Sequence, residues 1–254
     1  MQRYLNRSKI EILKAREYAL TFFTSMLYAP ISILIPFFLW KYIYKFQNDL
    51  SGMELREILF YLITIEIVQL SYSDLMAEVY YIFQDINTGA LDIAITKPIN
   101  YLLSRYFSAV GRVTITLPMG LISFIAVGIF FKALNINNII FFTLSLFLGF
   151  TIFFTVLGIL GISTFWLKSV LTLRDIFWFI LAIFSGQIFP LKIIGDGFFK
   201  HNPLAGIYYI PSIIVQEKDK ISLLLEQLMY LGIFVAILMI MWKIGIKKYE
   251  SQGG

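Results

Sequence analysis

The stretch IIFFTLSLFLGFTIFFTVLGILGISTFWL, Ile139–Leu167, contains no charged side chain in 29 residues. A helix that crosses the hydrocarbon core of a bilayer needs about 20 mostly apolar residues. Because backbone polar groups in lipid must bond to one another, an unbroken apolar stretch of this length indicates a helix and not the alternating pattern of a barrel strand. The stretch therefore predicts an integral membrane protein.

Five further apolar stretches extend this interpretation to a bundle. They are Tyr18–Trp40, Val113–Phe131 and Leu228–Trp242, which carry no charge, Ile58–Phe83, which contains acidic residues, and the short Ile176–Pro190. The hydrophobic fraction of 59% fits a membrane protein better than a soluble domain. We predict an all-α, polytopic membrane protein with six transmembrane helices within residues 18–243.

Lys and Arg residues set the expected orientation. An even number of spans puts both termini on one side, and that side carries thirteen Lys and Arg against eight on the other. The positive-inside rule therefore predicts that both termini are cytoplasmic, with 244–254 as a cytoplasmic tail. The expected location is the inner (plasma) membrane. The net charge of +5 comes from such flanking residues, so no nucleic-acid partner is expected. Without Cys there is no disulfide framework, and no metal site is predicted.

Residues 1–17, before the first span, predict an amphipathic elbow helix in the cytoplasmic interface of the membrane. Leu5 and Ile12 can share one helical face, with Arg7 and Lys14 on the opposite one. The alternative is a basic flank without helical structure.

The connection 84–112 is longer than the 2–8 residues usual between helices of a bundle. It contains TGALDIAITKPIN, Thr88–Asn100, in which Thr88 or Gly89 can open a helix and Pro98 restrains the residue before it. The sequence predicts a short helix within this cytoplasmic loop.

The outer segment, residues 191–220, combines apolar character with repeated Gly and Pro, which predicts broken helices. The fifth span, Ile176–Pro190, is about 22 Å long at 1.5 Å per residue, less than the ~30 Å hydrocarbon core. We therefore expect the outer segment, between helices 5 and 6, to be partly re-entrant and to compensate for this deficit.

Three strings in this order carry a family resemblance. They are GALDIAITKPIN at Gly89–Asn100, RDIFWFILAIFSGQIFPL at Arg174–Leu191 and NPLAGIYYIP at Asn202–Pro211. Together with the elbow helix and six spans, they resemble the six-helix type-2 permease subunits of bacterial ATP-binding-cassette (ABC) exporters. The resemblance covers nearly the whole chain.

The resemblance implies a permease that pairs with a second copy or a paralogue and binds two cytoplasmic ABC ATPase subunits. ATP and Mg would be held by those partners and no cofactor by this chain, which agrees with the absence of a GxxxxGK[ST] loop. The substrate would be amphiphilic, such as a drug, peptide or lipid. The short helix in the 84–112 loop would contact the ATPase, with Gly89, Leu91, Asp92, Lys97 and Pro98 as the coupling residues.

The export path is expected between two permeases, where the resemblance supplies the geometry and the sequence supplies polar residues. Intramembrane acids such as Glu66 face the bundle interior or a cavity. Asp74 and Glu78 lie deeper along the same stretch and are interpreted as residues of the inner interface. The candidate path residues are Glu66, Gln69, Phe184, Gly186 and Gln187.

Other function classes lack their signatures. A channel needs a polar or carbonyl filter, a secondary transporter often shows internal repeats, and an intramembrane enzyme needs a catalytic constellation. The sequence shows none of these, its sole histidine, His201, lies outside the membrane in the predicted topology, and no catalytic residue is predicted. The surviving alternative is a non-transporting membrane anchor or sensor subunit of a larger complex.

Overall fold

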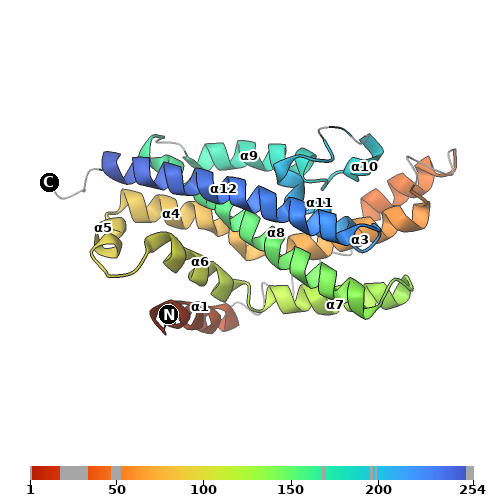
Figure 1. Ribbon diagram of the computed structural model, residues 1–254, viewed down its shortest axis with the longest axis horizontal. Helices are drawn as coiled ribbons and strands as arrows, with labels where there is room; N and C mark the ends of the chain where they lie inside the picture. The colour runs from red at the N-terminus through yellow and green to blue at the C-terminus, as the bar shows by residue number, and fades with distance from the viewer. Residues whose placement is uncertain are drawn as a thin grey trace.

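The computed structural model describes residues 2–17, 34–46, 53–167, 170–194, 197 and 199–249. Every regular element in this part of the chain is helical, as predicted. Figure 1 shows an elongated bundle with α5 (Ala90–Ile95) and the C-terminus at one end. The predicted span Tyr18–Trp40 lies outside the described residues except for its end, which belongs to the helix Leu34–Ile43.

Among the described residues, two helices are each long and apolar enough to cross a membrane. They are α8 (Ile136–Ile162), continued by η2 (Ser163–Phe165), and α12 (Lys220–Lys248). The two pack against each other along the bundle (Figure 1). The sixth predicted span thus begins eight residues earlier than Leu228, at Lys220.

Two bent pairs of helices in the described residues are each apolar enough to form one further span. The first joins α3 (Leu55–Ser71) through η1 (Ser73–Ala77) to α4 (Glu78–Asn87), with a bend of 46°. The second joins α6 (Tyr101–Arg112) to α7 (Thr116–Phe130), with a bend of 48°.

Local sequence explains both breaks. Pro118 has no backbone N–H for the Thr114 carbonyl, and its ring crowds that carbonyl, so the helix is interrupted just before α7. At the other break, Ser71 donates its hydroxyl to the Ile67 carbonyl at 2.7 Å, and such short polar side chains compete with regular helical bonding. The predicted span Ile58–Phe83 therefore continues past its break into α4. The predicted span Val113–Phe131 instead begins at its break and is preceded by α6, which the sequence placed in the loop.

The 84–112 connection is mostly helical and is not an open loop. α4 continues to Asn87, α5 is the short helix that the sequence predicts, and α6 begins at Tyr101. Gly89 starts α5 at φ +74°, a conformation that favours glycine. Asn100 caps α6 by accepting a 3.0 Å hydrogen bond from the Leu103 N–H. We call α4, α5 and α6 together, residues 78–112, the hairpin.

α1 (Gln2–Glu17) lies against α6. Ser8 donates its hydroxyl to the Phe107 carbonyl at 2.6 Å, and a Cβ at Gly111 would lie 2.6 Å from the Ser8 carbonyl oxygen. The helix therefore packs closely on the hairpin, while Ile10 and Leu13 remain exposed. Its place in the membrane interface remains a prediction.

α9 (Val170–Phe184) is the fifth predicted span and is also short, at 15 residues. It starts six residues before Ile176 and ends six before Pro190, so the predicted span is displaced along the chain. The structure and composition fit a helical membrane protein, and the described residues provide two spans, or four if each bent pair counts as one.

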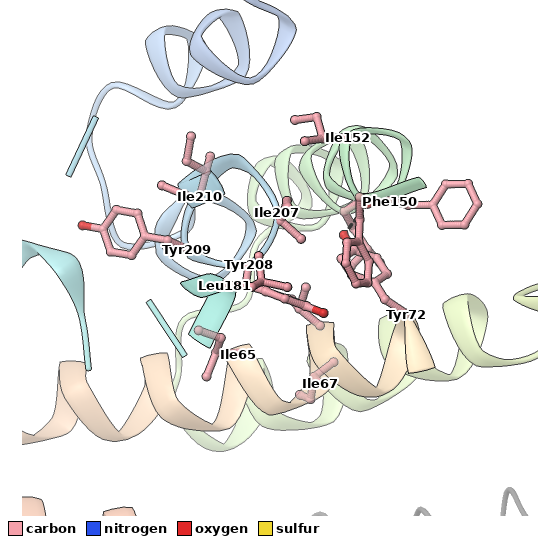
Figure 2. Close-up of a cluster of buried hydrophobic side chains, with 14 of the residues drawn as sticks. Ile65, Ile67, Tyr72, Phe150, Ile152, Leu181, Ile207, Tyr208, Tyr209 and Ile210 are labelled. Atoms are coloured by element: carbon pink, nitrogen blue, oxygen red, sulfur yellow. Dashed lines mark hydrogen bonds between the residues drawn. The ribbon is translucent and has the colours of Figure 1, made fainter. Parts of the chain in front are cut away.

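The outer segment consists of short, broken helices, as predicted. They are α10 (Leu191–Ile194), η3 (Pro203–Gly206) and α11 (Tyr209–Ile213). Figure 2 shows that Ile207 and Tyr208 lie between α3 and α8, where Tyr72 and Phe150 belong to the same buried cluster. The outer segment is therefore packed inside the protein, the condition under which irregular backbone is tolerated at membrane depth; its partly re-entrant position remains a prediction.

Candidate functional site

A buried ionic cluster joins the two long helices of the hairpin. Glu78, the first residue of α4, has no exposed surface. Its carboxylate accepts a 2.7 Å hydrogen bond from the Arg105 Nε and a second, short one from an Arg112 Nη. Two guanidinium groups from α6 therefore share one carboxylate from α4.

Aromatic and acidic neighbours complete this cluster. Both guanidinium groups lie 5.0 Å from the centre of the Tyr81 ring, which allows a cation–π attraction. Asp85 accepts a 2.7 Å hydrogen bond from the Tyr101 hydroxyl and lies 3.8 Å from Arg105. The contacts between α4 and α6 are thus directional over about two turns of α4 and three turns of α6.

α5 is fixed by an apolar cluster at the end of the hairpin. Leu91 is fully buried with residues of α4, α6, α8 and α12. These residues are Ile82, Ile86, Tyr101, Leu102, Ile162 and Leu238. Ile93 and Ile95, by contrast, are 62% and 45% exposed. α5 therefore presents apolar side chains outward from a firmly packed base.

The end of α12 also contacts this region. Trp242 stacks on Tyr101 with ring centres 5.2 Å apart and an angle of 9° between the planes. Burial and the neighbouring Asp92 carboxylate raise the pKa of the Tyr249 hydroxyl. Asp92 therefore lies beside the end of α12, the same helix that contributes Leu238 to the cluster around Leu91.

The five predicted coupling residues take different positions. Lys97 and Pro98 are exposed in the turn after α5, Asp92 is half-buried, and Gly89 opens the helix. Leu91 is fully buried and anchors α5 in the core. Ile93 and Ile95, which the sequence analysis did not select, are the exposed apolar side chains of α5.

Comparison with known families decides the class of the protein. The sequence model described as ABC-2 family transporter protein matches residues 30–253. The chain belongs to the ABC-2 transporter family. Comparison with curated proteins and with solved structures finds no significant match.

The resemblance to a type-2 permease is thereby confirmed. As an ABC-2 permease, the chain is a multi-pass transmembrane subunit of an ABC transporter; it associates with ATPase subunits and is not the ATPase. Among the described residues, no group of His, Asp and Glu side chains could hold a metal ion.

Three predicted path residues of the permease gather where α9 ends. Gly186 has φ +82°, and its carbonyl accepts a 2.5 Å hydrogen bond from the Tyr61 hydroxyl. Phe184 stacks on Phe199 with ring centres 5.6 Å apart. The Nε2 atom of Gln187 is buried and, within the described part of the permease, has no hydrogen-bond partner.

Ser185 extends this polar group. Its side chain is fully buried, and its hydroxyl has no hydrogen-bond partner among the described residues. Buried polar groups are normally paired, so these two groups set the turn at 185–187 apart from the other predicted path residues.

Glu66 and Gln69 do not belong to this turn. Glu66 is five residues from Tyr61, or about 140° around α3, so the two side chains leave the helix on different faces. Both Glu66 and Gln69 are half-buried. The structure thus separates the predicted path residues into two groups.

The ionic cluster was missed by sequence analysis. Glu78 was interpreted as a residue of the inner interface, yet it is fully buried and paired twice. Arg105 and Arg112 were counted only as orienting charges, although their spacing of seven residues puts both on one face of a helix. Helical periodicity in 101–112 was the available signal, and the interpretation of this stretch as a loop concealed it.

Proposed function

We propose that the chain is the permease subunit of an ABC exporter that pairs with a second permease and two ATPase subunits. The observation that supports this best is that α5 exposes apolar side chains while its other side is packed against the bundle. Its outward side chains Ile93 and Ile95 are exposed, while Leu91 fixes the helix to four other helices. An exposed apolar group on a rigid base suits docking into a groove of a cytoplasmic partner.

The proposed export path runs between two permeases past the turn at 185–187. The Ser185 hydroxyl and the Gln187 Nε2, which have no hydrogen-bond partner among the described residues, supply hydrogen-bonding groups in largely apolar surroundings. This combination favours an amphiphilic substrate, because a pathway of this kind can contact both an apolar body and a polar head.

The test of ATPase docking uses Ile93→Asp. The permease is co-expressed with an ABC ATPase from the same organism that co-purifies with the native permease. The amount of ATPase that co-purifies with the variant is then measured. Burying an Ile side chain contributes about 1.5–3 kcal/mol, so we expect at least about a tenfold loss of bound ATPase. Ile221→Asp is the matched control, because Ile221 is 63% exposed and lies at the start of α12.

Retention of the ATPase by Ile93→Asp at the native yield would place the docking surface elsewhere. If the native permease binds no ATPase and drives no ATP-dependent efflux in vesicles, the anchor or sensor role replaces the exporter.

Gln187→Leu tests the path separately, with an expected change in substrate range and unchanged ATPase binding. An unchanged range in Gln187→Leu and in Ser185→Ala would remove this turn from the path.

A further inference from the structure

The breaks in the two bent spans lie side by side. The Thr116 hydroxyl at the start of α7 donates to the Ser71 carbonyl at the end of α3, at 3.0 Å. One turn further, a Cβ at Gly120 would lie 1.9 Å from the Ser71 Oγ. The absence of a side chain at Gly120 therefore allows α7 to pack closely against α3. The two spans therefore bend at one level and by similar angles, 46° and 48°.

The Glu78 cluster lies directly beyond both breaks. Glu78 begins α4 and Arg112 ends α6, so this ion pair joins the two helices at the base of the hairpin. Farther along, Tyr101 bonds to Asp85 at 2.7 Å, and Leu91 closes the far end. The hairpin is thus held at its base, its middle and its tip.

The contacts of the hairpin with the rest of the bundle are different in kind. α4 packs on α8, where a Cβ at Gly161 would lie 2.8 Å from the Ile82 side chain. This α4–α8 contact is apolar, and the contact of α6 with α8 adds one neutral hydrogen bond, between the Tyr106 hydroxyl and the Thr151 Oγ1 at 3.2 Å. Packed apolar helix surfaces can shift by small sliding motions, whereas a buried ion pair specifies one arrangement.

We propose that the hairpin moves as one body about the paired breaks at 72–77 and 113–115, and that Glu78 is the positioning residue that makes it one body. A displacement of α5 would then reach α3 and α7 together. The role of this movement in transport rests on the proposed function, but the rigidity of the hairpin does not. Glu78 touches neither substrate nor nucleotide in this account; it acts through Arg105 and Arg112.

The test uses spin labels, which the absence of Cys makes straightforward. Labels at Asn87→Cys on α4 and Leu103→Cys on α6, both exposed positions, report the distance across the hairpin. In the full chain alone in lipid nanodiscs, we expect a single narrow distance distribution. Glu78→Gln leaves two buried guanidinium groups without their carboxylate, so the width should increase at least about twofold through local opening.

Two control variants separate positioning from general destabilisation. Glu78→Asp keeps the carboxylate and should restore most of the narrow distribution. Glu217→Gln removes an ion pair of the outer segment, Lys192–Glu217 at 3.1 Å, and should leave the width unchanged. If Glu78→Gln does not fold, Arg105→Lys, which keeps the charge but loses the planar guanidinium group, should give a smaller broadening.

Two results would overturn the proposal. One is a broad distribution in the native hairpin, and the other is an unchanged width in both Glu78→Gln and Arg105→Lys. Because the labelled chain is measured without a partner, failure of ATPase binding leaves this result intact. The two proposals therefore fail independently.

Discussion

The hairpin and the outer segment are both irregular connections, but different forces hold them. The hairpin depends on a carboxylate that is fully buried between two guanidinium groups. The outer segment is held by neutral groups: Gln227, also fully buried, donates to the Gly206 carbonyl at 2.8 Å and accepts from Ser145 at 2.8 Å. Ion pairs of the outer segment, such as His201–Glu226, lie at its more exposed edge.

This difference has a physical reason. A neutral amide that is fully bonded can sit at membrane depth at small cost, whereas a buried charge requires a partner and fixes its geometry. The outer segment is therefore built for close packing, and the hairpin is built to keep one arrangement of α4 and α6. On the proposed movement of the hairpin, the outer segment is static filling and the hairpin transmits the displacement.

The largest expected effect comes from breaking the ionic cluster. Glu78→Leu should destabilise the permease by about 3–5 kcal/mol, because two buried guanidinium groups lose their carboxylate. Glu217→Leu at a more exposed pair should cost at most about 1 kcal/mol. Unfolding in mild detergent measures both; equal losses would mean that the hairpin is held no differently from the outer segment.

A smaller loss is expected in the outer segment. Gln227→Leu leaves the Gly206 carbonyl and the Ser145 hydroxyl without this partner, at a cost of about 1–2 kcal/mol for neutral groups in a membrane protein. Thermal unfolding of the purified permease measures it. The spin-label distance across the hairpin should stay unchanged, and a change there would show that the two regions are not independent.

The smallest expected change in stability comes from the turn after α7. Lys132 follows α7 at φ 52°, where a Schellman arrangement bonds the Ala133 N–H to the Gly128 carbonyl at 2.9 Å. Lys132→Gly should stabilise the permease by about 1 kcal/mol, because glycine adopts this conformation without strain. A destabilised Lys132→Gly protein would mean that the lysine side chain makes a compensating contact.

Much of the architecture follows from the sequence, because apolar length and Gly and Pro positions act locally. The α8 span, the short α5 after Gly89 and the broken outer segment were all predicted on such grounds. The partners of Glu78 were not, since Arg105 and Arg112 lie 27 and 34 residues away across a stretch interpreted as a loop. The inward direction of Leu91 depends on the packing of four other helices, which no local pattern records.

The most direct test measures movement in the permease–ATPase complex. One label pair spans the breaks, at Lys97→Cys and Ile129→Cys, and the second is the Asn87→Cys and Leu103→Cys pair within the hairpin; all four positions are exposed. Trapping the complex with ATP and vanadate should shift the distance across the breaks and leave the distance within the hairpin unchanged. A distance change within the hairpin, or no change in either pair while the ATPase is trapped, would contradict the account.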